Sequence, residues 1–165
     1  MAYARRHLNL TVLPTGEVLA TGGVAGTIFN DVSTGVHAAE LWNPATGQWT
    51  TLASNAVTRG YHGSSLLLPD GRVLNAGGGE GAGAPDERNA ELFSPPYLFR
   101  GARPTITSAP AEVGYRNQFR IDTPDASGLT VTAPSSSNRA PPGHYMVFIL
   151  NGSDVPSVAK IVRIY

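Results

Sequence analysis

Short apolar runs alternate with clusters of turn-forming residues along the whole chain, and this pattern predicts strands. The chain contains 19 glycines and 13 prolines in 165 residues, and they cluster between the apolar runs. No window of about a dozen residues repeats apolar side chains at helical spacing, so we expect almost no helix. Short strands separated by tight turns containing Gly and Pro predict an all-β protein.

Two segments of the first hundred residues repeat each other. Residues 7–23, HLNLTVLPTGEVLATGG, align without a gap with residues 62–78, HGSSLLLPDGRVLNAGG. Each segment indicates a strand, a turn, a second strand and a diglycine; in the turn Pro presets φ and Gly accepts positive φ. Further along, AAELWNPATGQW at 38–49 is echoed by NAELFSPPYLF at 89–99. The repeated unit is therefore a pair of hairpins with four strands.

A period near 50 residues with four short strands is typical of a kelch-type propeller blade. We predict two blades, each a four-stranded antiparallel sheet, over residues 1–55 and 56–100. The segment SLLLP is apolar on both faces, as expected for a strand covered from both sides. Two blades do not close a propeller. The two sheets therefore pack on each other, assemble with other copies, or belong to a longer chain.

The pattern of apolar and polar residues changes after residue 100. Residues 101–165 carry short apolar-polar alternations separated by Pro and Ser clusters, above all APSSSNRAPPG at 133–143. The alternating runs are TITSAP, NQFRIDTP, GLTVTAP, GHYMVFIL and AKIVRIY. This pattern predicts a small immunoglobulin-like β-sandwich with about five strands.

Charge and composition narrow the range of partners. Twelve basic and twelve acidic residues cancel, so a basic face for nucleic acid or an acidic membrane is not expected. No apolar run has the length of a membrane span, and MAYARRHLNL lacks the apolar stretch of a secretion signal. The absence of cysteine excludes disulfides, thiolate metal sites and cysteine nucleophiles.

A string of motifs resembles the last part of galactose oxidase and glyoxal oxidase-like proteins. The motifs are RGYHGSSLLLPDGRV, NAELFSPPYLF, RPTIT, PPGHYMVFIL and VPSVAKIVRI. That family joins a kelch propeller to a C-terminal early set, immunoglobulin-like domain. Its members are copper-radical oxidases that oxidise primary alcohols or aldehydes with dioxygen and release hydrogen peroxide. The resemblance implies copper as cofactor, a small alcohol or aldehyde as partner, and secretion from the cell.

The resemblance also assigns a metal site to Tyr61 and His62. Family members hold copper with two tyrosines and two histidines, so Tyr61 is the implied axial ligand and proton acceptor, and His62 an equatorial ligand. Imidazole suits Cu(II), and a metal-bound phenol loses its proton more readily. Consecutive strand residues point to opposite faces, so both reach one metal only where a strand begins or bends. The preceding Arg59 and Gly60 permit such a bend.

The chain departs from the family pattern at the remaining ligands. The cysteine crosslinked to the radical tyrosine is absent, and that tyrosine belongs to an earlier blade. The second histidine lies in a segment that is missing here, because FRIDTPDA passes directly to SGLTVTAP. We therefore expect an early set domain over 101–165 that is shortened in its middle, an incomplete copper site, and an isolated chain without oxidase activity.

The other histidines offer weaker candidates. His7 occupies the repeat position equivalent to His62, and Arg6 precedes it. An Arg–His pair there could contact an anionic substrate or product, since guanidinium matches carboxylate geometry. The preferred alternative is a histidine that hydrogen-bonds a backbone carbonyl. We expect His144 to be a half-exposed edge residue, and His37 receives no role.

Two further functions compete with that of an oxidase fragment. One is a non-catalytic module that binds carbohydrate or protein, with aromatic side chains that stack on a sugar. The aromatic candidates are Trp42, Trp49, Tyr97 and Phe99. The other is a structural remnant that persists only by self-association. The acidic loop GGGEGAGAPDERNAE at 77–91 lacks the ligand spacing of a calcium loop, so we expect it to be solvated.

Overall fold

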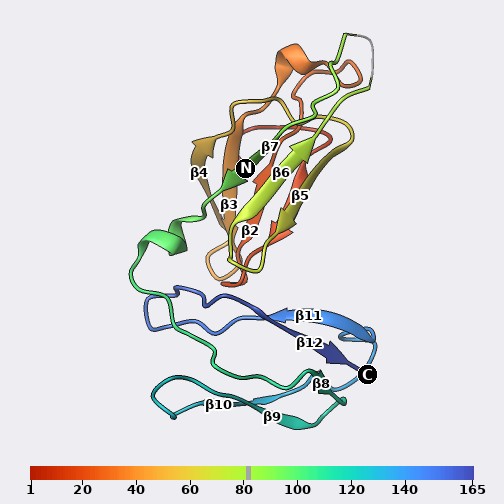
Figure 1. Cartoon of the computed structure of the whole chain (residues 1–165). Helices are drawn as coiled ribbons and strands as arrows, with labels where there is room; N and C mark the ends of the chain where they lie inside the picture. The colour runs from red at the N-terminus through yellow and green to blue at the C-terminus, as the bar shows by residue number, and fades with distance from the viewer. Residues whose placement is uncertain (81–82) are drawn as a thin grey trace. The chain divides into compact units, whose positions relative to one another are not determined.

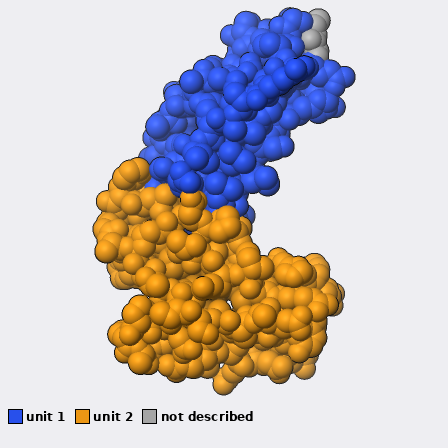
Figure 2. Space-filling view, viewed as in Figure 1, with its two compact units in different colours: residues 1–68, 72–95 blue, residues 69–71, 96–165 orange. Residues whose placement is uncertain are grey.

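The computed structural model describes residues 1–80 and 83–165, which form two compact units (Figure 2). Unit 1 comprises Met1–Leu68 and Arg72–Pro95, and unit 2 comprises Pro69–Gly71 and Pro96–Tyr165. Nearly all regular structure is strand, which confirms the all-β prediction (Figure 1). Among the described residues no helix is long and apolar enough to cross a membrane.

Unit 1 contains two antiparallel sheets, in the orders β1-β2-β3-β4 and β5-β6-β7 (Figure 1). Its elements are β1 (Asn9–Val12), β2 (Val18–Thr21), the 3-10 helix η1 (Val32–Thr34), β3 (Ala38–Asn43), β4 (Gln48–Ser54), β5 (Gly63–Leu67), β6 (Val73–Gly77) and β7 (Ala90–Phe93). Each sheet opens with the repeated hairpin, and the turn glycines Gly16 and Gly71 have φ of 82° and 80°. The repeat is therefore a repeat of conformation as well as of sequence.

The second sheet has three strands among the described residues, whereas the sequence predicted four. The segment NAELFSPPYLF supplies only β7, and its second half forms the 3-10 helix η2 (Pro96–Phe99). Pro95 and Pro96 have no backbone N–H to donate to a ladder, and their fixed φ suits a tight helical turn. The assignment of the two sheets as propeller blades stays a prediction.

The two sheets of unit 1 pack face to face through β1 and β5. Leu19 of β2 and Val73 of β6 are completely buried. Three hydrogen bonds also join the sheets: Asn9 Nδ2 to the Gly63 carbonyl (3.1 Å), Thr11 Oγ1 with Ser65 Oγ (2.9 Å) and Thr21 Oγ1 to Asn75 Oδ1 (2.9 Å). The apolar contact supplies most of the stabilisation, and the hydrogen bonds satisfy the polar groups buried with it.

An arginine–glutamate pair recurs at the same place in both sheets. Arg5 Nη2 contacts Glu40 Oε2 at 2.5 Å, and Arg59 Nη2 contacts Glu91 Oε2 at 3.1 Å. The Nη1 group of each arginine donates to two backbone carbonyls, those of Gly22 and Ala38 in the first sheet and those of Gly77 and Asn89 in the second. The glutamate of each Ala-Glu-Leu motif is thus the partner of an arginine before the first strand of its sheet.

Unit 2 consists of a three-stranded sheet, β11-β12-β8, and a two-stranded sheet, β10-β9. The strands are β8 (Glu112–Val113), β9 (Gln118–Ile121), β10 (Leu129–Thr132), β11 (Gly143–Val147) and β12 (Lys160–Ile164). Five strands were expected and five are found, but one of them differs. The segment TITSAP forms only an isolated bridge, between Ser108 and Asp122, and β8 is the strand that was not expected. Phe119 of β9 and Val147 of β11 pack against the same buried residues, so the sheets share a core.

The point of the expected shortening lies in a hairpin loop, residues 122–128, between β9 and β10. Ile121 at the end of β9 pairs with Leu129 at the start of β10. Within the turn, hydrogen bonds from Thr123 and Ser127 hold the pKa of Asp125 below its ordinary range. The strands β9 and β10 therefore pair directly, and residues 122–128 form the connection between them.

Two other features of unit 2 bear on its stability. Arg103 donates to the carbonyls of Pro156 (2.9 Å), Ser157 (2.9 Å) and Asp70 (2.7 Å), and so joins the RPTIT and VPSVA motifs. A cavity of about 210 Å³ lies between the sheets. Its lining is largely apolar: Val113, Phe119, Val131, Thr132, Ala133, Pro134, Tyr145, Val147, Val162 and Ile164.

Candidate metal site

Tyr61 and His62 lie immediately before β5, and their rings stack on each other. The ring centroids are 3.9 Å apart and the planes differ by 30°. His62 has φ of 62°, a left-handed conformation that interrupts the alternation of a strand. Both side chains therefore lie on one side of the backbone, which is the bend that a shared metal would require.

A buried asparagine fixes the backbone beneath this pair. Asn30 Oδ1 accepts a hydrogen bond from the Tyr61 amide at 2.9 Å, and its Nδ2 donates to the Gly79 carbonyl at 2.8 Å and to the Glu80 carbonyl. A Cβ atom at Gly60 would lie 2.2 Å from Asn30 Oδ1, so this position requires glycine. Asn30 was not predicted, because its segment TIFND lies outside the repeated hairpins and carries no recognisable signal.

A carboxylate faces one nitrogen of the candidate histidine. His62 Nδ1 lies 3.2 Å from Glu80 Oε2, and both side chains are more than half exposed. Histidines that ligate metals usually present their other ring nitrogen to a carboxylate or carbonyl, which fixes the ring and the tautomer. The contact leaves Nε2 of His62 for coordination. From the sequence, Glu80 was expected only to lie in a solvated acidic loop.

The repeat brings a second histidine to the same cluster. His7 has φ of 57°, nearly that of His62, and its ring lies edge-on to Tyr61 with centroids 5.3 Å apart. Phe29 completes an aromatic group, at 4.9 Å from Tyr61 and 5.2 Å from His7. Nε2 of His7 is buried and has no hydrogen-bond partner among the described residues. The expected backbone carbonyl partner is therefore absent at this nitrogen.

His7 reaches the aromatic cluster through its ring contacts with Phe29 and Tyr61, whereas the contacts of Arg6 described here are those of its backbone. Its backbone N–H and carbonyl pair with those of Val24 at 3.0 Å each, and the residue as a whole is exposed. An Arg6–His7 pair that contacts an anionic substrate stays a prediction. His7, rather than Arg6, is the residue that the fold brings to Tyr61.

The side chains of Tyr61 and His62 at this end of unit 1 are of the kind that suits copper. A phenol oxygen and an imidazole nitrogen match the preference of Cu(II) for nitrogen and oxygen donors. In the part of the chain that the structure describes, no group of three or more His, Cys, Asp or Glu side chains could hold a metal ion. An incomplete copper site at Tyr61 and His62 stays a prediction.

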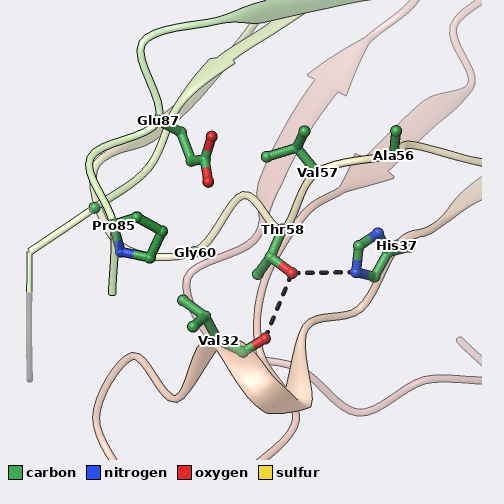
Figure 3. Close-up of a pocket in the computed structure, with 9 residues that line it drawn as sticks. Val32, His37, Ala56, Val57, Thr58, Gly60, Pro85 and Glu87 are labelled. Atoms are coloured by element: carbon green, nitrogen blue, oxygen red, sulfur yellow. Dashed lines mark hydrogen bonds between the residues drawn. The ribbon is translucent and has the colours of Figure 1, made fainter. Parts of the chain in front are cut away.

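A pocket of about 290 Å³ lies between loops at the same end of unit 1 (Figure 3). His37 stands on its wall, with Nδ1 2.9 Å from the Asn55 carbonyl and Nε2 3.1 Å from Thr58 Oγ1. Both ring nitrogens thus have local partners, so His37 has a structural role here. The carboxylate of Glu87 faces the same pocket in Figure 3, and one of its oxygens accepts from Asn89 Nδ2 at 3.0 Å.

The remaining candidates fall on other surfaces. His144 is exposed on β11, an edge strand, as expected. Tyr97 is buried, and its hydroxyl donates to the Gly71 carbonyl at 2.5 Å, so it is unavailable for stacking on a sugar. Trp42 and Trp49 pair across β3 and β4, and Phe99 is exposed. The acidic loop includes residues 81–82, which lie outside the described residues.

Part of the second unit matches a known domain family. Residues 123–164 match the family described as galactose oxidase-like, early set domain. A galactose oxidase of Gibberella zeae is 32% identical over 201 aligned positions, which cover 98% of this chain and 30% of that protein. The aldehyde oxidase GLOX of Vitis pseudoreticulata is 31% identical, and the alignment covers 99% of this chain and 42% of that protein.

A solved structure extends the likeness to the whole fold. A fungal alcohol oxidase of the AA5 family, in complex with copper, superposes with a TM-score of 0.91 at 26% identity, covering 99% of this chain and 43% of that one. Unit 2 therefore contains a galactose oxidase-like early set domain. The chain as a whole is similar to galactose oxidase and to aldehyde oxidase GLOX, and it spans less than half the length of these relatives.

The alignments also bear on the expected internal shortening. The alignment with galactose oxidase extends over 201 positions, whereas the whole chain has 165 residues. The surplus positions are gaps in this chain, so it is shorter than its relatives within the region that they share. The early set match begins at residue 123, inside the loop that joins β9 to β10.

Proposed function

We propose that this chain is part of a copper-dependent oxidase and that it supplies Tyr61 and His62 as two of the metal ligands. The observation that carries the proposal is the stacked Tyr61–His62 pair at the bend before β5, with Glu80 on Nδ1 of His62. The copper-containing alcohol oxidase, similar over 99% of this chain, supports copper as the metal. A small primary alcohol or aldehyde as substrate, and an extracellular location, belong to the same proposal.

The reaction would transfer two electrons and two protons from a primary alcohol to dioxygen, giving an aldehyde and hydrogen peroxide. Copper, when bound, would supply the redox chemistry. The part of this chain is to present the phenol oxygen of Tyr61 as ligand and proton acceptor, and to hold the His62 ring against Glu80. Because two protein donors leave the ligand set incomplete, the isolated chain binds copper weakly and does not turn over.

Copper titration of the isolated chain tests the site. We expect a Cu(II) signal in electron paramagnetic resonance with nitrogen hyperfine structure, weakened in Tyr61→Phe and lost in His62→Ala. His144→Ala, an exposed histidine of unit 2, is the matched control and should leave the signal unchanged. An identical response of all three variants would exclude Tyr61 and His62 as the ligands.

A peroxide assay tests the second part of the proposal. The chain is mixed with Cu(II), dioxygen and a panel of primary alcohols and aldehydes, and hydrogen peroxide is measured over time. We expect no more peroxide than copper alone produces. Sustained turnover that depends on His62 would show that the described donors are sufficient, contrary to the proposal.

A further inference from the structure

The chain contains two acceptor sequences for N-linked glycosylation, that is, Asn-x-Ser or Asn-x-Thr in which x is not proline. They are Asn9-Leu10-Thr11 and Asn151-Gly152-Ser153. A glycan is bulky and hydrophilic, so a folded protein accepts one only on an asparagine whose amide can face solvent. The structure places the two acceptor sequences in different surroundings.

The first acceptor sequence lies between the two sheets of unit 1. Asn9 opens β1, and its Nδ2 donates to the carbonyl of Gly63 in β5 at 3.1 Å. Thr11 is 6% exposed, and its hydroxyl oxygen lies 2.9 Å from that of Ser65. A glycan on Asn9 would begin at the nitrogen that contacts β5, and it would separate the sheets. Asn9 is therefore closed to this modification in the folded chain.

The second acceptor sequence forms a turn of unit 2, between β11 and β12. The Asp154 amide donates to the Asn151 carbonyl at 3.0 Å, and Gly152, Ser153 and Asp154 are all exposed. The side chain of Asn151 holds this turn, because its Oδ1 accepts from the amides of Ser153 (2.9 Å) and Val155 (3.0 Å). The acceptor sequence is therefore presented on an exposed loop of defined conformation.

The hydrogen bonds of the Asn151 side chain are compatible with a glycan on Nδ2. This atom donates to the Ala102 carbonyl at 2.9 Å, and the contact lies at the surface. A side-chain amide carries two N–H groups, and glycosylation replaces one of them. The other N–H still donates to Ala102, and Oδ1 keeps both of its backbone partners. Modification of Asn151 therefore preserves the turn, whereas modification of Asn9 would break the contact with β5.

We propose that Asn151 is a site of N-linked glycosylation and that Asn9 is not. The inference rests on the extracellular location included in the proposed function, because N-linked glycans are attached to chains that enter the secretory pathway. The donor is a lipid diphosphate that carries an oligosaccharide. A bond forms between Nδ2 of Asn151 and C1 of the first sugar, the C1–O bond to the diphosphate breaks, and one Nδ2 proton is released to solvent.

Expression of the full chain behind a secretion leader in yeast tests the proposal. Peptide N-glycosidase F leaves aspartate at each asparagine that carried a glycan, so peptide mapping after digestion identifies the modified positions. We expect conversion at Asn151 and none at Asn9. Ser153→Ala should abolish the glycan and Ser153→Thr should keep it. Ser137→Ala, at an exposed serine outside both acceptor sequences, is the control and should leave the glycan unchanged.

Retained and secreted protein are both mapped, because the glycan is attached on entry to the secretory pathway. Glycan at Asn151 in either fraction supports the proposal, and an unmodified Asn151 in both would overturn it. Glycan on Asn9 in protein with native tryptophan fluorescence would contradict the exclusion of that residue. The copper titration uses chain produced in bacteria without this glycan, so a failure of the proposed function is seen separately.

Discussion

Arg5 and Glu40 form an ion pair from which solvent is fully excluded. The guanidinium and carboxylate lie 2.5 Å apart, each side chain has no exposed surface, and the Ala2 amide also donates to Glu40. A buried pair contributes modest net stability, but the removal of one partner leaves an uncompensated charge. The pair therefore acts as a strong constraint on how the N-terminal segment covers β3.

Glu40→Gln should destabilise unit 1 by about 3–5 kcal/mol, because it leaves the Arg5 charge buried without its counterion. Trp42 and Trp49 both lie in this unit, so denaturant unfolding followed by tryptophan fluorescence reports on it. Asp86→Asn, at an exposed carboxylate, should change stability by less than about 0.5 kcal/mol. An equal decrease in the free energy of unfolding of both variants would contradict this role of the Arg5–Glu40 pair.

The Arg59–Glu91 pair should make the stability of unit 1 depend on pH. Burial alone raises the pKa of Glu91, but hydrogen bonds from the Ala56 amide and Arg59 outweigh it, so the pKa lies below its ordinary value. A carboxylate with a lowered folded pKa stabilises the fold above its unfolded pKa. That stability is lost as the pH falls through the folded pKa. The denaturation midpoint of unit 1 should therefore drop in acid, and less steeply in Glu91→Gln.

Gly22 and Gly47 together test whether close packing against Arg59 requires glycine. Gly22 and Gly47 have φ of 66° and 69°, so alanine carries the same backbone strain of about 1–2 kcal/mol at either position. A Cβ atom at Gly22 would lie 2.5 Å from the Arg59 carbonyl oxygen, whereas Gly47 has open space. Gly22→Ala should therefore lower the free energy of unfolding clearly more than Gly47→Ala does. The same decrease in both variants would show that the backbone around Arg59 moves to accommodate the added Cβ atom without loss of stability.

The contact between Glu80 and His62 has a consequence for copper binding. A carboxylate on the second ring nitrogen of a metal-ligating histidine is worth about 10–100-fold in affinity. Glu80→Gln should therefore raise the dissociation constant of Cu(II) about tenfold by calorimetric titration. Glu112→Gln, a surface carboxylate of unit 2, serves as control. An unchanged constant in Glu80→Gln would show that this contact plays no part in holding the ring.

The local features of the fold were predictable, because turn and strand signals act over a few residues. The hairpins β1–β2 and β5–β6 follow from the repeated Pro-x-Gly turns, and the diglycines adopt the positive φ that glycine allows. The prediction of a fourth strand in the second sheet was wrong, although Pro95 and Pro96, which cannot donate to a strand ladder, indicated against it. The bend at Tyr61–His62 was expected, and the φ of His62 provides it.

The long-range contacts were not predictable from spacing. Arg5 and Glu40 are 35 residues apart, and each charge alone indicates a solvated surface. The recurrence of both residue types in the second repeat, as Arg59 and Glu91, was the available signal for the pair. The approach of His7 to Tyr61 depends on how one sheet packs on the other, which no local pattern specifies.

The largely apolar pocket of about 210 Å³ between the sheets of unit 2 leaves this unit with space that its side chains do not fill. Hydrostatic pressure favours the state of smaller volume, and unfolding eliminates such voids. The polar, open pocket of unit 1 admits water and offers no comparable gain in volume. A pressure ramp should therefore melt the early set domain while the tryptophan-bearing sheets remain folded.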